Sequence, residues 1–204
     1  MTLSVKSLCA VLGVLPIAIF SGCAHLNPTV ADPAGASSDA RIVVPENFDH
    51  TLLARAIFEK TNRARLACGV SPLAHLPALD AAAEEQAFCM QLALDAKHDN
   101  PATREHTTAD RIAHAGLPPS AFGENVLMQS ARDGVSPTDP NYTYSSIAAA
   151  CVSSWLGSPG HRENLLDPKF THLGCAARLA RVVSGETCVF AVQVFYRQPP
   201  KPVL

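Results

Sequence analysis

Apolar side chains recur at helical spacing in four segments of the chain. Residues 48–66 would place their apolar side chains on one helix face, made of Leu52, Leu53, Ala56, Ile57 and Ala64. Residues 78–96 are dense in alanine and end before Pro101, because a residue that precedes proline avoids helical geometry. Residues 108–115 and 145–156 repeat the helical pattern. The sequence therefore predicts four main helices.

Three further segments have the composition of β-strands. Residues 187–196 are rich in β-branched and aromatic side chains, and residues 171–179 precede them across a turn at Ser184 and Gly185. Residues 122–128 form a third strand that enters the core. Helices on both sides of a small antiparallel sheet accommodate all of these elements, which predicts an α+β fold.

The first 44 residues follow neither pattern. After a lysine, residues 8–20 form an apolar run that is shorter than the roughly 20 residues a membrane-spanning helix needs. This order predicts a signal peptide over residues 1–22. The Ser-Gly-Cys that follows resembles a bacterial lipobox, so acylation of Cys23 is expected, with plain secretion or a retained anchor as alternatives. Residues 23–44 are expected to be a flexible tether to a domain over residues 45–198.

Composition and charge narrow the classes of function. Of the 204 residues, 48% are hydrophobic and 17% are charged, which is typical of a globular chain and not of a disordered one. The formal net charge is −2, and no stretch concentrates Lys and Arg, so a nucleic-acid partner is not expected. The sequence also contains no glycine-rich phosphate loop and no dinucleotide-binding motif.

Seven cysteines constrain the chemistry of the domain. Two lie in the first 23 residues, and the other five show no Cys-x-x-Cys spacing, which disfavours a structural zinc ribbon. An exported domain meets an oxidising compartment in which disulfides persist. Cys175 and Cys188 fall in the two neighbouring strand segments and are the expected disulfide pair. Cys151 lies in a helical segment and is expected to fill the core instead of acting as a nucleophile.

Three side chains on separate segments could form a chemical site. His98 follows the second helical segment, Glu124 lies in a Gly-Glu-Asn step, and His161 lies in a Ser-Pro-Gly-His turn before a short leucine-bearing helix. Two imidazoles and a carboxylate suit zinc, and the same set could instead transfer protons. Each residue also has a purely structural explanation, since histidines at helix ends often bind carbonyls. Spacing alone does not show that the three converge.

Several short motifs, taken in order, resemble the CAP superfamily, which includes cysteine-rich secretory proteins, insect venom antigens and plant pathogenesis-related proteins. The motifs occupy residues 62–65, 69–73, 79–83, 110–112, 115–116, 123–126, 152–166, 170–174 and 192–195, with Met90 and His98 at the family's intervals. The resemblance covers roughly residues 48–196, which is almost all of the expected domain. The ordered set, more than any single motif, identifies the family.

The resemblance implies an α-β-α sandwich with a cleft lined by two histidines and two glutamates. Carried over by motif, the histidines are His98 and His161 and one glutamate is Glu124, whereas Ser158 occupies the second acidic position. His98 and His161 are then the expected metal ligands, with zinc or another divalent cation as a candidate cofactor. A second departure is Lys97, which precedes His98 where an aromatic-Ser pair is typical.

Three functions are compatible with these expectations. The first is an extracytoplasmic lipoprotein whose cleft binds a lipid, a peptide, a cell-wall fragment or an envelope protein; it is favoured because the sequence contains no hydrolase nucleophile motif. The second is a metal-dependent hydrolase, in which zinc activates water and Glu124 serves as base. The third is a structural envelope protein with a vestigial cleft. Ala24, behind the acylated cysteine, makes the outer membrane the default location.

Overall fold

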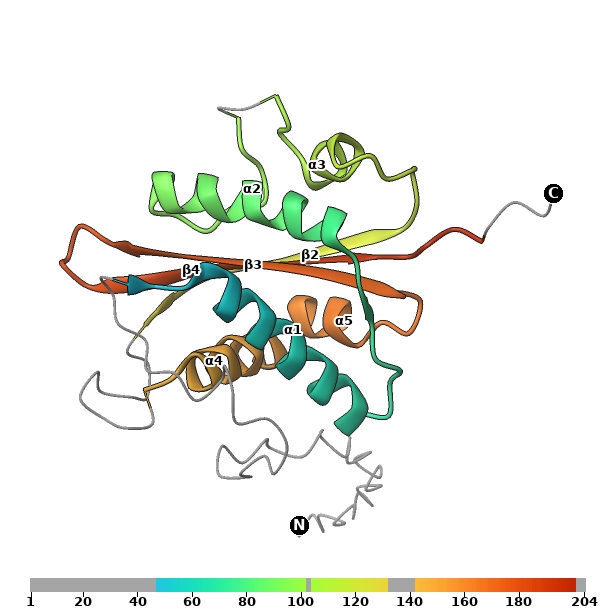
Figure 1. Ribbon diagram of the computed structural model, residues 1–204, viewed down its shortest axis with the longest axis horizontal. Helices are drawn as coiled ribbons and strands as arrows, with labels where there is room; N and C mark the ends of the chain where they lie inside the picture. The colour runs from blue at the N-terminus through green and yellow to red at the C-terminus, as the bar shows by residue number, and fades with distance from the viewer. Residues whose placement is uncertain (1–46, 102–103, 132–141, 201–204) are drawn as a thin grey trace, which may run out of the picture.

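The structure, a computed structural model, describes residues 47–101, 104–131 and 142–200. These residues form five helices and four strands (Figure 1). None of the helices in these three ranges is long and apolar enough to cross a membrane. The expected signal peptide, Cys23 and the tether lie outside the described residues, so these assignments stay predictions.

A four-stranded sheet forms the middle layer, in the order β1-β3-β4-β2. The strands are β1 (Ala74–His75), β2 (Phe122–Ser130), β3 (His172–Arg181) and β4 (Thr187–Tyr196). The central strand β4 pairs antiparallel with both β2 and β3, whereas β1 pairs in parallel with the first two residues of β3. The three long strands confirm the prediction. The two-residue β1 was not expected, since it is too short to show a period.

Helices cover both faces of this sheet. On one face lie α1 (His50–Ala67), α4 (Tyr144–Gly157) and α5 (Pro159–Leu166); on the other lies α2 (Pro77–Ala93), with α3 (Thr108–His114) beside it (Figure 1). Each face has its own hydrophobic core, and Trp155 and Cys151 are fully buried in the core under α1 and α4. The layers confirm the predicted α+β sandwich.

Local side-chain signals set where the helices begin. The Asp49 carboxylate accepts a hydrogen bond from the Leu52 amide at 2.9 Å and caps α1. Thr107 and Thr143 open α3 and α4 with capping boxes. The last helix, α5, begins at Pro159, so His161 lies within its first turn and not in a turn before it.

Two strand glycines allow neighbouring layers to approach closely. A Cβ atom at Gly174 would lie 2.2 Å from the backbone carbonyl carbon of Leu79, so α2 rests directly on β3. A Cβ atom at Gly123 would lie 2.9 Å from Oδ1 of Asn164, so α5 lies directly against the start of β2. These contacts explain why glycines occupy both motifs.

The predicted disulfide between Cys175 and Cys188 is wrong. Cys175 lies opposite Gln193, and Cys188 lies opposite Ala180, five positions further along β3. Five strand residues span about 16 Å, whereas the α-carbons of a disulfide lie within about 7 Å. The strands are neighbours as predicted, but their register separates the thiols. Cys175 is a buried free thiol, and burial raises its pKa well above the usual value, which makes it chemically inert.

Candidate functional site

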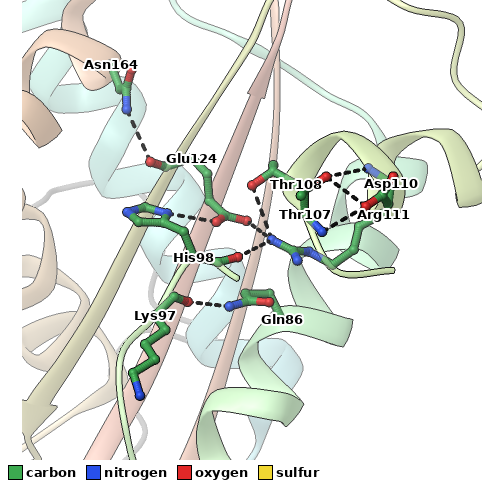
Figure 2. A network of polar contacts seen from close by, with 9 residues as sticks. All are labelled: Gln86, Lys97, His98, Thr107, Thr108, Asp110, Arg111, Glu124 and Asn164. Carbon is green, nitrogen blue, oxygen red and sulfur yellow. Dashed lines mark hydrogen bonds and ion pairs between the residues drawn. The ribbon is translucent and has the colours of Figure 1, made fainter. Parts of the chain in front are cut away.

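Glu124 is a buried carboxylate near the start of β2. Its backbone is paired with Val194 of the central strand, and its side chain is only 3% exposed. Oε1 accepts a hydrogen bond from Nδ1 of His98 at 2.9 Å, and Oε2 accepts one from Nη2 of Arg111 at 2.7 Å (Figure 2). Because a carboxylate only accepts, the proton of this contact sits on Nδ1 of His98. Both oxygens of Glu124 are therefore engaged.

Arg111 of α3 is the buried cation that balances Glu124. Its side chain is 1% exposed, and Nη2 also donates to the His98 carbonyl oxygen and to Oγ1 of Thr108, each at 3.2 Å. The capping box of Thr107 and Asp110 holds the helix that carries it (Figure 2). Arg111 therefore acts both as the ion-pair partner of Glu124 and as a clamp on the His98 carbonyl.

His98 presents its ring to solvent from this buried pair. Its side chain is 54% exposed, and the Gln86 amide donates to the carbonyl of Lys97 and fixes the preceding backbone (Figure 2). The hydrogen bond to Glu124 raises the pKa of His98, against an opposing effect of burial. No described residue bonds Nε2, so this atom is available to a ligand.

His161 is held through its backbone and not through its ring. Its carbonyl oxygen accepts a hydrogen bond from Nδ2 of Asn125 at 3.0 Å, and no described residue bonds the ring. Burial lowers the pKa of His161, and the positive charge of His98 lowers it further. The two rings therefore lie within electrostatic range of each other.

A chain of buried amides connects His161 to the core. Nδ2 of Asn125 donates to Oε1 of Gln193 at 3.0 Å, and Nε2 of Gln193 donates to Oγ1 of Thr61 at 2.6 Å. Nδ2 of Asn164 donates to Oδ1 of Asn125 at 3.0 Å and to the Glu124 carbonyl at 3.2 Å. Asn164 thereby anchors α5 to β2. Asn125 connects His161 to Glu124, because its side chain bonds the His161 carbonyl and its backbone directly follows Glu124 in β2.

The two histidines differ in the charge they carry near neutral pH. The pKa of His98 is raised and that of His161 is lowered, so a pH range exists in which His98 is cationic and His161 is neutral. In that range the site offers a charged donor and a neutral imidazole. Two residues of the same type can take different chemical roles when their surroundings shift their pKa values in opposite directions.

The donor set fits a metal centre poorly. Among the residues that the structure describes, no group of three or more His, Cys, Asp or Glu side chains is placed to hold a metal ion. The Glu124 carboxylate is committed to Arg111, and Ser158 caps the junction of α4 and α5 in place of a second acid. Two imidazole nitrogens fall short of the three protein ligands of a catalytic zinc site. Metal binding by His98 and His161 stays a prediction.

The structure brings His98, in the loop after α2, into contact with Glu124 of β2, and places His161 of α5 within electrostatic range of His98. The polar core residues Gln86, Gln193 and Thr61 were not expected. All three are at most 1% exposed. Only Gln193 carried a signal in the sequence, as a neutral polar side chain inside an apolar run. Since a buried polar group needs a partner, such positions point to a network even when its members cannot be named.

A comparison with protein-family models identifies the family to which this site and its fold belong. Residues 58–195 match the model of the cysteine-rich secretory protein family, CAP. The chain belongs to the CAP family. Among curated proteins, no sequence matches the chain. The CAP match includes His98, Glu124 and His161, together with the helices and strands that position them.

Solved bacterial structures share the CAP fold of this chain. An extracellular protein containing an SCP domain from Bacillus anthracis str. Ames is 24% identical, with a TM-score of 0.56 over 78% of this chain and 45% of its own. An outer surface protein from Borrelia burgdorferi is 18% identical, with a TM-score of 0.51 over 74% of this chain and 97% of its own. The chain therefore spans less than half of the Bacillus protein. At these identities the likeness concerns the fold alone.

Proposed function

We propose that this CAP domain works at the bacterial cell envelope, as a lipoprotein acylated at Cys23, and binds a ligand between His98 and His161. The ligand would carry an anionic group, a carboxylate or a phosphate, and could belong to a lipid, a peptide or a cell-wall fragment. The lipobox-like sequence supports the envelope location. The Bacillus protein is extracellular and the Borrelia protein is an outer surface protein, which is compatible with this location.

One observation carries the choice of ligand chemistry: both oxygens of Glu124 are already engaged, by His98 and by Arg111. The buried ion pair therefore presents no free negative charge, and the half-exposed ring of His98 is the group that it offers to solvent. A cationic imidazole with a free Nε2–H is a charge-assisted donor, which favours an anionic acceptor.

The same observation disfavours the hydrolase alternative. A general base must have an oxygen within hydrogen-bond reach of the attacking water. Here the Glu124 side chain is only 3% exposed, with Arg111 at 2.7 Å from Oε2 and His98 at 2.9 Å from Oε1, so an attacking water has little access to either oxygen. Binding therefore accounts for the geometry better than water activation by Glu124.

The proposal is tested by titrating the protein with inorganic phosphate and, separately, with zinc, while the histidine ring signals are followed by NMR at pH 6. His98→Ala and His161→Ala are compared with His114→Ala, a control on α3 whose ring bonds Glu105 at 3.2 Å. We expect phosphate to shift the His98 signals and to lose affinity in His98→Ala, with no change in His114→Ala.

Vesicles distinguish the sources of the anion. Stronger binding of a soluble form to phosphatidylglycerol vesicles than to phosphatidylcholine vesicles, lost in His98→Ala, would indicate a lipid headgroup. Unaltered His98 signals with phosphate would contradict the anion proposal. Micromolar zinc binding that needs both histidines would instead establish the metal site.

A further inference from the structure

Gln86 is the polar member of the buried face of α2. Its side chain is 1% exposed, and the other buried residues of that helix are apolar. They are Leu79, Ala82, Ala83, Ala87 and Met90. A buried polar group without a partner destabilises a fold, so a glutamine on such a face needs hydrogen bonds. The contacts of Gln86 therefore bear on why α2 carries it.

One of the two polar atoms of Gln86 has a partner and the other has none. Nε2 donates to the carbonyl of Lys97, whereas no described residue bonds Oε1. A methionine would fill a similar volume without an unpaired oxygen. Gln86 is thus not the side chain that best stabilises this core. Such departures from the locally most stable choice are expected at functional positions.

The partner of Gln86 directly precedes His98. Arg111 of α3 donates from Nη2 to the His98 carbonyl at 3.2 Å, so α2 and α3 bind two consecutive carbonyl groups of the loop between them (Figure 2). Gln86 and Arg111 are each 1% exposed, so the core holds the loop backbone. From this backbone the half-exposed ring of His98 reaches Glu124.

The two contacts differ in what else they hold. Arg111 also bonds the Glu124 carboxylate, so its removal would disturb the loop and the buried ion pair together. Gln86 bonds no described residue besides Lys97. Its influence on the histidine site must therefore pass through the backbone of Lys97 and His98, which makes it the cleaner position to test.

We propose that Gln86 is a positioning residue of the histidine site, which holds the His98 ring in place for its ligand at a cost in fold stability. The inference rests on the proposed binding of an anion at His98 and adds a residue that does not touch the anion. The ring bonds Glu124 through Nδ1, and a fixed backbone keeps Nε2 in one direction. Preorganisation of this kind raises affinity, because binding then restricts fewer conformations.

The test compares Gln86→Met with Gln91→Met in the full-length protein. Gln91 lies on the same helix and also donates from Nε2 to a backbone carbonyl, that of Leu179 in β3, at 2.7 Å. The strand β4 separates β3 from β2 and its Glu124, so Gln91 is a matched control. In NMR titrations with inorganic phosphate at pH 6, Gln86→Met should bind about fivefold more weakly, which corresponds to about 1 kcal/mol, and Gln91→Met should bind as the unaltered protein does.

Urea denaturation separates positioning from a role in the fold. Because Gln86→Met removes the unpaired oxygen from the core, the variant should be at least as stable as the unaltered protein. A clear loss of stability would overturn the proposal, since Gln86 would then serve the fold. Unchanged phosphate affinity in Gln86→Met would overturn it as well.

Backbone relaxation gives a readout that needs no ligand. The order parameter of the His98 amide should fall below the value of a rigid backbone, about 0.85, in Gln86→Met and not in Gln91→Met. An unchanged order parameter would contradict the positioning role. If phosphate fails to bind the unaltered protein, the proposed anion site is wrong, and the order parameter alone then decides for or against Gln86.

Discussion

The two halves of the histidine site hold the same type of ring by different means. His98 is held by charge, because its ring bonds the Glu124 carboxylate that also binds the buried Arg111. His161 is held by neutral amides, because Asn125 bonds its backbone and leaves its ring without a described partner. One ring has its pKa raised and the other has it lowered.

The difference shows that the chemical role of a motif residue depends on the groups that hold its side chain or backbone in place. The same imidazole becomes a cation where a carboxylate faces it and a neutral group where burial dominates. Glu124, which resembles a ligand or base in the sequence, is instead the residue that orients His98. We call His98, Glu124 and Arg111 the charged half of the site, and His161 with Asn125 the amide half. The comparison between them can be tested by substituting the residues that hold each histidine in turn.

The largest effect is expected from Glu124→Gln. The substitution leaves the buried Arg111 guanidinium without its counter-charge, which should lower the free energy of unfolding by about 3–5 kcal/mol. Urea denaturation measures the change. Glu59→Gln removes an exposed pair with Arg55 and serves as the control, with an expected loss below about 1 kcal/mol. Equal losses in the two variants would mean that the buried pair does not organise the charged half.

Asn125→Ala should have the next largest effect. It removes the donor to the His161 carbonyl and to Gln193, and the acceptor for Asn164, all in a buried place. We expect a loss of about 2 kcal/mol in the free energy of unfolding. Gln129→Ala, which breaks an exposed hydrogen bond with Ser154, should cost far less. If Asn125→Ala matched this control, the amide half would not depend on its network.

The ring substitutions should have smaller and unequal effects. His98→Ala removes the partner of Oε1 of Glu124 and should destabilise the fold by about 1 kcal/mol or less, whereas His161→Ala removes no described ring contact. Because the folded-state pKa of His98 is raised, its extra stabilisation is fully present below its unfolded pKa of about 6.5 and is lost as pH rises through the folded value.

Unfolding of His98→Ala and the unaltered protein at pH 5.5 and at pH 9 checks that sign. The difference in unfolding free energy between the two proteins should be larger at the lower pH. A difference that grows toward pH 9 would show that the Glu124 contact does not favour the charged ring.

Much of the fold followed from periodicity, and the limits of that signal are specific. The apolar face of α1 and the β-branched run of β4 each extend over a long segment, so their patterns could be recognised. The predicted pairing of Cys175 with Cys188 failed because it rested on the strands being neighbours and not on their register. The observed register differs from that pairing by five residues, an odd number, which places the two thiols in the cores on opposite faces of the sheet.

The site was predictable in part. The motif resemblance named His98, Glu124 and His161, and the structure places His98 against Glu124. The commitment of Glu124 to Arg111 depends on how α3 packs against α2, which no local pattern encodes. Gln193 lies in an apolar strand, where its side chain gives no indication that it bonds Thr61 across the core.

The most direct test of the central claim is an NMR pH titration of the two histidine rings in the unaltered protein. If Glu124 fixes His98 as the cationic group while burial keeps His161 neutral, the His98 ring will titrate at a clearly higher pH than the His161 ring. Coincident midpoints, or the reverse order, would contradict the account, because the site would then lack the charge asymmetry on which anion binding by His98 depends.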